Sequence, residues 1–368
     1  MALRDGRQYA LIASRRFTIA APGHLPLPPI RFSLVDVPDL EVLPDLWPSV
    51  QSVWMGAGPV PEILHRALNL AAWLVRLKLL PSLSSFAPLM YRTINVLAWG
   101  EHRGGMFVEV EGRGVHDAPA RRSWHMIAEG ADGPFIPSMA AEAIIRRCLD
   151  GRRPAAGARA AVRELEVADY DALFARRRIF SGVRETPDPA APLYYRLLGE
   201  AWRALPEPVR ALHDNTGALE TEGTATVQRG TNPIARVVAT LMGFPPAGRD
   251  VPVKVSFRVH EGRETWRREF AGRAFESIQE EGRGRFERLV VERFGPLAFA
   301  MALVLDDDRL RVIVRRWSAF GLPMPLWLAP GGEAYESAED GRFNFHVEIA
   351  HKLIGRIVRY DGWLVRRK

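Results

Sequence analysis

The chain has 368 residues, of which 47% are hydrophobic and 25% charged, and its formal net charge is +7. This length suits two domains, and the hydrophobic content excludes wholesale disorder. The positive charge comes almost wholly from arginine, because the chain holds only four lysines, namely Lys78, Lys254, Lys352 and Lys368. We interpret the charge as arginine spread over solvated faces, and we predict no nucleic-acid partner.

The single cysteine, Cys148, excludes an internal disulfide and a cysteine-based zinc site. Its helical context predicts a buried structural thiol. No sustained apolar run near the N-terminus resembles a signal peptide. These features predict a reducing, cytoplasmic setting.

The segment VWMGAGPVPEIL, residues 53–64, has the outline of a dinucleotide-binding loop. Such a loop needs three glycines, so that backbone amides can approach a pyrophosphate. Gly56 and Gly58 are present, but Pro61 stands at the third position and Pro59 removes an amide. We therefore predict that this chain alone binds no dinucleotide cofactor.

Two helices are predicted next, from Pro61 to Pro81 and from Pro88 to Trp99, joined as a helical hairpin. The uncharged run between Arg66 and Arg76 is too short to span a membrane. The pattern favours a hairpin packed into a core. The alternative is peripheral contact with the inner face of a membrane, through the interfacial residues Trp73, Arg76, Lys78 and Trp99.

Two strands are predicted within residues 104–130, followed by a helix with Ser138 as its N-cap and Gly151 beyond its end. The triplet Arg176–Arg178 suits a helix end, where cations complement the dipole. The proline-rich segment 186–191 is the predicted linker between domain 1–185 and domain 192–368.

The second predicted domain begins with an amphipathic helix over residues 192–206, a strand over 223–230 and a helix capped by Asn232. Alternating strands follow, for example at 251–260, 297–305 and 343–350. They predict an antiparallel sheet with one apolar face, long enough to curl around helices or a ligand. The fold class is therefore α+β: an N-terminal mixed α/β domain of substrate type with a helical hairpin, then a β-rich antiparallel-sheet domain with a few helices.

Whole segments of the first domain resemble a known family. SLVDVPDLEVLP, EHRGGMFVEVEG, SWHMIAEGADGPFIPSMAAEAIIRRCLDG and RELEVADYDALFARRRIFSGVRE resemble the C-terminal, substrate-side half of bacterial saccharopine-dehydrogenase-like oxidoreductases. LYYRLLGEAWRALPEPVRALHD, MGFPPAGRDVPV, ERFGPLAF and GRFNFHVEI resemble domain of unknown function 4166. The first similarity covers about residues 31–185, and the second runs from about residue 192 to the end.

The first resemblance implies an N-terminal Rossmann domain that this chain lacks, so we expect a truncated oxidoreductase. NAD(P) would act only if a separate Rossmann-type subunit supplied its site, and a homodimer is the other expected assembly. The predicted function is an oxidoreductase-derived protein that is active only with such a partner, or inactive. The alternative is a non-catalytic protein that binds a lipid-like or other apolar small molecule in its β-rich domain.

Candidate site residues fall in both domains. In the first, polar and aromatic side chains near a glycine pair could line a substrate pocket, namely Glu101, His102, Arg103, Trp124, His125 and Asp132. An acid–base pair of His125 with Asp132 is one interpretation, and ordinary surface or hydrogen-bonded histidines are the other. The histidines His102, His116 and His125 match no metal signature, so no metal site is predicted. In the second domain, an apolar cavity or a packed core would contain Trp266, Phe299, Met301, Trp317 and Trp327.

Overall fold

The computed structural model describes residues 16–96, 100–114, 117–159 and 161–367. Contacts divide the chain into two compact units. The first comprises the segment up to Thr18 together with Pro28–Arg103, and the second comprises Ile19–Leu27 together with Gly104–Lys368. The predicted linker 186–191 therefore lies inside the second unit.

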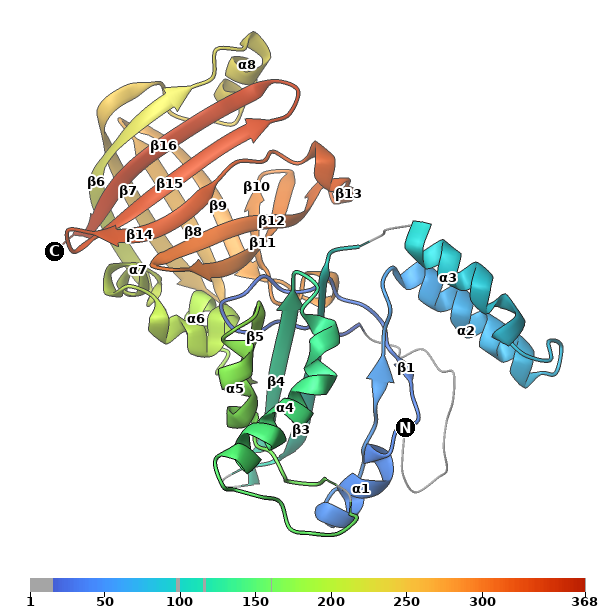
Figure 1. Ribbon diagram of the computed structural model, residues 1–368. Helices are drawn as coiled ribbons and strands as arrows, with labels where there is room; N and C mark the ends of the chain where they lie inside the picture. The colour runs from blue at the N-terminus through green and yellow to red at the C-terminus, as the bar shows by residue number, and fades with distance from the viewer. Residues whose placement is uncertain (1–15, 97–99, 115–116, 160, 368) are drawn as a thin grey trace. The chain divides into compact units, whose positions relative to one another are not determined.

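The first unit holds a two-stranded sheet and three helices (Figure 1). Its elements are β1 (Ser33–Leu34), α1 (Asp39–Leu46), β2 (Gly56–Ala57), α2 (Glu62–Arg76), η1 (Ser84–Phe86) and α3 (Ala87–Val96). Both helices of the predicted hairpin are present, with Pro61 as the N-cap of α2 rather than its first residue. The predicted interfacial residue Trp99 lies outside the described residues.

The apolar side chains of α2 and α3 are half-buried or exposed, and none of those that the structure describes is fully buried. Leu70 of α2 is 64% exposed and Val96 of α3 is 79% exposed. Within α2 the one buried side chain is His65. The prediction that this hairpin packs into a core is therefore not supported by the burial of its side chains.

The two glycines of residues 53–64 serve packing. A Cβ atom on Gly58 would come within 2.4 Å of the Phe32 ring and 2.8 Å of the Arg31 carbonyl oxygen, so a larger residue is excluded there. Phe32 stacks on Phe17 with 5.4 Å between ring centroids. The glycine therefore allows a small aromatic cluster beside β1 and β2.

The second unit begins with a three-stranded sheet in the order β3-β4-β5. Its elements are β3 (Arg103–Arg113), β4 (Pro119–Glu129), η3 (Gly133–Phe135), α4 (Ile136–Leu149), α5 (Val167–Phe174) and β5 (Ile179–Glu185). Met126 of β4, Met139 of α4 and Phe174 of α5 share one buried cluster. Ser138 lies in the first turn of α4 and its Oγ donates to the Phe135 carbonyl oxygen, so the predicted N-cap is wrong.

The amphipathic helix predicted over residues 192–206 is two short elements, α6 (Leu193–Leu198) and η4 (Gly199–Ala204), followed by α7 (Glu207–His213). Gly199 has a φ of +61°, which a straight helix does not allow. Five of the six residues of α6 are buried, including Arg196. The segment therefore packs on several sides, because its side chains belong to the core that the following strands enclose.

That sheet contains eleven strands and is antiparallel throughout (Figure 1). The strands are β6 (Ala218–Arg229), β7 (Gly248–His260), β8 (Arg263–Phe270), β9 (Arg273–Glu281), β10 (Val290–Phe294), β11 (Leu297–Asp306), β12 (Arg309–Ala319), β13 (Leu322–Met324), β14 (Ala334–Glu339), β15 (Arg342–His351) and β16 (Gly355–Arg366). Between them lie α8 (Pro233–Leu241), η5 (Gly284–Phe286) and η6 (Leu326–Leu328). The Asn232 Oδ1 accepts from the Ile234 amide at 2.9 Å, which confirms the predicted cap of α8.

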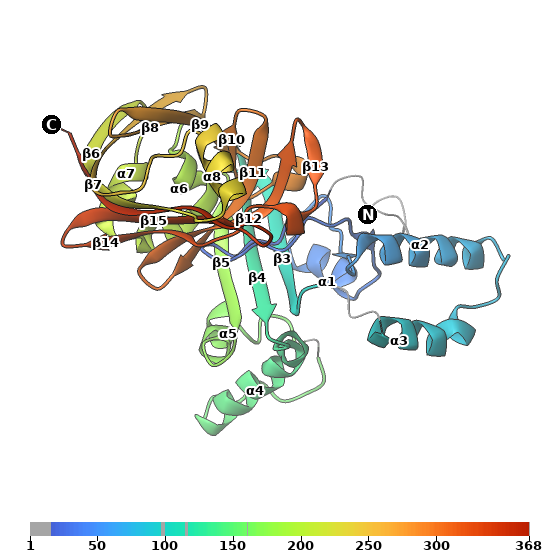
Figure 2. The ribbon, with the colours of Figure 1, turned by 90° about the horizontal axis from the view of Figure 1, so that it is seen from above.

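The order β11-β10-β9-β8-β7-β6-β16-β15-β14-β12 closes on itself, because β12 also pairs with β11. Of the eleven described strands, β13 pairs with β12 and extends beyond this ring, which leaves ten strands in the closure. We call these ten strands the closed sheet. Seen from above, α6 and α7 lie between its β8–β9 side and its β14–β15 side (Figure 2).

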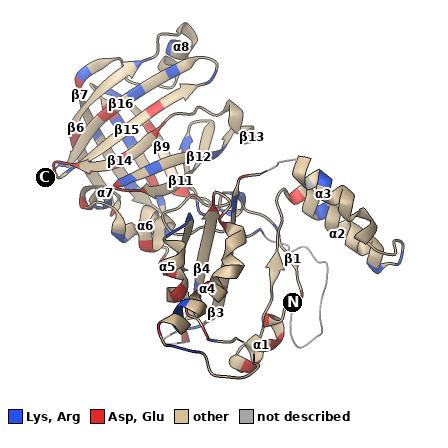
Figure 3. Cartoon of the chain, in the orientation of Figure 1, with Lys and Arg blue, Asp and Glu red and all other residues tan. Residues whose placement is uncertain are grey.

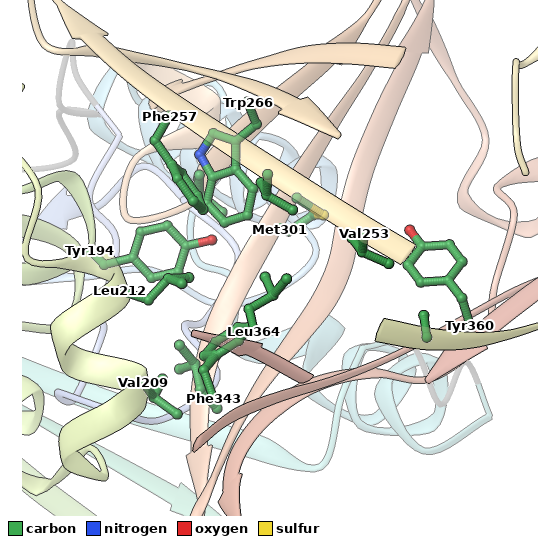
Figure 4. Close-up of a cluster of buried hydrophobic side chains, with 14 of the residues drawn as sticks. Tyr194, Val209, Leu212, Val253, Phe257, Trp266, Met301, Phe343, Tyr360 and Leu364 are labelled. Carbon is green, nitrogen blue, oxygen red and sulfur yellow. The ribbon is translucent and has the colours of Figure 1, made fainter. Parts of the chain in front are cut away.

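The predicted alternation is confirmed on several strands of the closed sheet. Val253, Val255 and Phe257 of β7 are buried in one large interior cluster, whereas Lys254 and Arg258 are exposed. The same cluster contains side chains from α6 and α7, among them Tyr194 and Leu212 (Figure 4), and two alanines of α8. Among the described residues, no helix has the length and apolarity that a membrane crossing requires.

Candidate functional site

The inner face of the closed sheet carries a buried polar network on β8, β9 and β10. Arg268 Nη2 donates to Glu292 Oε1 at 2.9 Å, and Arg268 Nη1 donates to Ser277 Oγ at 2.7 Å. Ser277 Oγ also donates to Glu292 Oε1, at 2.6 Å. The Arg268 and Glu292 side chains are only 14% and 10% exposed, so this charged pair is held almost out of water.

A second group of polar side chains extends the network to the helices. His213, at the end of α7, is 1% exposed, and its Nε2 lies 2.6 Å from Glu336 Oε2 on β14. The His213 ring stacks on Tyr194 of α6 with 3.7 Å between centroids. The Tyr194 hydroxyl donates to Gln279 Oε1 on β9 at 3.2 Å. His213 therefore joins α7 to α6 and β14, and Tyr194 continues the connection to β9.

Burial controls the protonation of the groups around Tyr194. Desolvation raises the pKa of the Tyr194 hydroxyl well above its usual value, with Glu336, Glu292 and Glu264 adding to the effect. The hydroxyl therefore stays protonated and can donate. Desolvation likewise raises the pKa of the Glu264 carboxyl, although the hydrogen bond from the Trp266 indole, which donates at 3.1 Å, opposes the shift.

His213 has one ring nitrogen without a partner. Its Nδ1 is buried and makes no hydrogen bond to any part of the chain that the structure describes. A buried polar atom without a partner costs about 1–3 kcal/mol, so such atoms are uncommon in folded proteins. The interior therefore offers an unused hydrogen-bonding position next to Tyr194 and Glu336.

Four of the five predicted apolar-site residues are brought together by the closed sheet. Trp266, Phe299 and Met301 are buried in the interior cluster, and Figure 4 shows Trp266 near Phe257. Trp317 is half-buried, and its ring lies parallel to that of Phe299 with 6.1 Å between centroids. Trp327 on η6 is 64% exposed, so it does not join them.

In the first unit, the predicted residues Glu101 and Arg103 pair with each other. Arg103 Nη1 donates to Glu101 Oε2 at 2.8 Å. His102 between them is exposed. The third predicted histidine, His116, lies outside the described residues, and among those described no three His, Cys, Asp or Glu side chains are grouped to hold a metal ion.

In the second unit, the predicted residues His125 and Asp132 have different partners. His125 Nδ1 accepts from the Ala20 amide at 3.3 Å, and its Nε2 lies 2.9 Å from Ser123 Oγ. Asp132 accepts from the Arg178 amide at 2.9 Å and from Arg177 Nη1 at 3.1 Å. Both nitrogens of His125 are thus engaged without Asp132, and the proposed acid–base pair is not formed. Trp124 packs against the cluster beneath α4 and α5.

His125 should make stability depend on pH. Burial, with Arg184 the next cause, lowers the pKa of His125 from 6.5 to about 3. The folded chain therefore keeps this ring neutral, while the unfolded chain takes up a proton as the pH falls below 6.5. Stability is therefore lost between pH 6.5 and 3.

The variant His125→Gln tests this dependence, because glutamine keeps a hydrogen-bond donor and an acceptor but does not titrate. Between pH 7.5 and 5 the wild type should lose about 2 kcal/mol more unfolding free energy than this variant, measured by urea titration. Equal losses in both proteins would contradict this assignment.

One family profile matches the region that builds this site. Residues 205–364 match the family described as a domain of unknown function (DUF4166). The match begins just before α7 and ends within β16, so it contains the closed sheet and His213. No curated protein matches the chain.

Proposed function

We propose that the closed sheet is a binding domain for an apolar small molecule that carries one hydroxyl or amine group. The observation that carries this proposal is the buried Nδ1 of His213, which is unused within the described chain and lies at the end of α7, packed against a ten-stranded ring. Eight strands enclose just enough space for their own side chains, and the diameter grows with strand number. A ring of ten strands is wider than one of eight, which supports the proposal that its interior has room for a ligand.

The polar part of the interior favours a hydrogen-bond donor. When Nε2–H of a neutral His213 donates to the Glu336 carboxylate, the Nδ1 lone pair is an acceptor. The carboxyls of Glu264 and Glu292 lie close enough to influence Tyr194, so the surroundings are rich in acceptor oxygens. An O–H or N–H group would be stabilised there, whereas a ligand carboxylate would be repelled.

The other part of the interior is apolar and would take the body of the ligand. Phe270 and Phe275 lie at the ends of β8 and β9 that are farthest from α7, with rings parallel and 6.1 Å between centroids. Phe299 and Trp317 continue this aromatic lining on β11 and β12. The arrangement suits a molecule with its polar group near His213 and its apolar part directed towards α8.

One pairing between neighbouring strands of the ring, which we call a seam, is short enough to open and admit a ligand. β12 pairs with β14 through only two registered positions, Leu310 with Glu336 and Arg311 with Tyr335. By contrast, β11 and β12 are paired along their whole length, from Leu297–Ala319 to Asp306–Arg309. Fewer ladder hydrogen bonds make local opening cheaper, so we assign the entry route to the β12–β14 seam.

A displacement assay tests this specificity. N-phenyl-1-naphthylamine, a neutral fluorophore, should bind the protein and be displaced by 1-hexadecanol or hexadecylamine. Hexadecanoic acid should need a concentration at least about tenfold higher, because its carboxylate meets acceptors instead of donors. The paired variant His213→Phe with Glu336→Gln removes the acceptor without leaving a charge unpaired, and it should abolish this preference. Equal displacement by alcohol and acid in the wild type would contradict the proposal.

The oxidoreductase-derived function stays a second proposal for residues 31–185, supported by the sequence resemblance. In that view, catalysis requires NAD(P) on a separate Rossmann-type subunit. Two exposed side chains one turn apart on α4, Ile145 and Leu149, support a docking surface for such a partner. NADPH titrated into this chain alone and followed by calorimetry should show no binding, and micromolar binding would refute the proposed dependence on a partner.

A further inference from the structure

The two ends of the closed sheet differ in chemistry. The end next to α7 carries the turns between β7 and β8, β11 and β12, and β14 and β15. Exposed charges of both signs lie in or beside these turns, namely Glu261, Asp306, Asp307, Asp308, Glu339 and Asp340 with Arg263, Arg309 and Arg342. The opposite end carries α8, residues 320–333 and the turn between β15 and β16 (Figure 1). That end exposes large apolar side chains instead.

We call these side chains the apolar rim. They are Ile234, Val237, Leu241, Phe320, Leu322, Leu326, Trp327 and Leu353. Leu241 and Phe320 are each 81% exposed, and Leu353 is 79% exposed. Isolated apolar side chains on a surface are ordinary, but eight at one end of a sheet mark an interaction site.

The segments of the apolar rim are neighbours. Gly331 and Ala350 form an isolated β-bridge, which joins the segment after η6 to the end of β15. The Gly230 amide donates to the Ile357 carbonyl oxygen at 3.3 Å, which joins the start of the α8 segment to β16. The rim therefore runs from η6 past Leu353 to α8 without leaving this end of the sheet.

The helix α8 is built to present its apolar face outwards. Ala235 and Ala239 are fully buried against the interior cluster. Ile234, Val237 and Leu241 are spaced along the opposite face of the helix, and each is at least 58% exposed. Arg229 fixes this segment, because its guanidinium donates to the Pro245 carbonyl oxygen at 2.8 Å and also contacts the Phe244 carbonyl oxygen.

The charges around the apolar rim are mainly positive. Residues 320–332 contain no acidic residue, and this segment is uncharged in Figure 3. Arg236 on α8, Arg273 at the start of β9 and Lys352 beside Leu353 are exposed cations. Burial lowers the pKa of Arg229, and the charges of Arg273 and Arg236 lower it further. Glu333 and Asp250 are exposed acids at this end of the sheet.

We propose that the apolar rim docks on an anionic lipid membrane. Apolar side chains and a tryptophan beside basic residues are the composition of interfacial membrane contacts. The exposed cations Arg236, Arg273 and Lys352 would also attract this end of the closed sheet to a negative surface. This interaction goes beyond ligand binding and does not rest on it, because none of the rim side chains belongs to the buried network.

Vesicle co-sedimentation of the full chain tests the proposal. The wild type should bind vesicles of phosphatidylcholine with phosphatidylglycerol more tightly than vesicles of phosphatidylcholine alone. Leu241→Ser together with Trp327→Ser should weaken binding at least about tenfold. Lys352→Gln should weaken it about fivefold at low salt and hardly at high salt.

Two control variants show whether vesicle binding depends on the apolar rim or on other exposed surfaces. Leu149→Ser changes a leucine that is 82% exposed on α4, and Lys254→Gln changes an exposed lysine on the outside of β7. Both should bind vesicles as the wild type does. The proposal is overturned if the wild type binds neither vesicle, or if Leu70→Ser on α2 abolishes binding while the rim variants retain it. It is also overturned if the rim variants abolish self-association of the chain and leave vesicle binding unchanged.

Discussion

Replacing Arg268 with methionine is expected to destabilise the closed sheet by about 3–5 kcal/mol. The substitution leaves the Glu292 carboxylate, whose side chain is only 10% exposed, without its cation. It also removes the guanidinium from above the Trp266 ring, where it lies 4.7 Å from the centroid. Urea unfolding followed by circular dichroism at pH 7.5 measures the loss.

Two further variants show whether the loss comes from the unpaired charge. Arg268→Met combined with Glu292→Leu removes both charges, and most of the lost stability should return. Arg311→Met removes a surface partner of Asp306, where both side chains are at least 41% exposed, and should cost less than about 1 kcal/mol. A loss for Arg268→Met as small as that for Arg311→Met would contradict the burial of this network.

The strands could be predicted from the sequence wherever apolar and polar residues alternate. Phe299, Met301 and Leu303 on β11 are buried as their spacing predicts. Closure of the sheet could not be predicted in the same way, because it depends on two pairings between strands that are not consecutive, β6 with β16 and β12 with β14. Local alternation indicates a face, but it does not indicate which distant strand lies next to it.

The polar network escaped prediction because β8 and β9 carry charged residues on both faces. Arg267 and Arg268 are adjacent in the sequence, yet the first is exposed and the second is half-buried within the ring. A strand of this composition is typical of a solvated edge. Only the positions of Ser277 and Glu292 on neighbouring strands show why Arg268 can point inwards.

Long-range contacts also explain why His125 does not pair with Asp132 as predicted. Its partner amide, Ala20, lies 105 residues earlier in the chain. Arg184 donates to the Ala20 carbonyl oxygen at 2.7 Å and to the Leu197 carbonyl oxygen at 2.8 Å, so it links this segment to α6. The proline-rich sequence that follows Ala20 gives no sign of these contacts.

Substitution of Met301 by tryptophan tests most directly whether the closed sheet encloses a ligand. Met301 is 8% exposed and lies on the inner face of β11 (Figure 4). If the interior has room for a ligand, the indole should occupy that room, and affinity for N-phenyl-1-naphthylamine should fall at least about tenfold with little change in unfolding free energy. Lys254→Trp places the same side chain on the outside of β7 and should leave binding unchanged. If instead the wild type does not bind the fluorophore and Met301→Trp costs about 1–3 kcal/mol, as overpacking of a filled core does, the interior is a core and not a binding site.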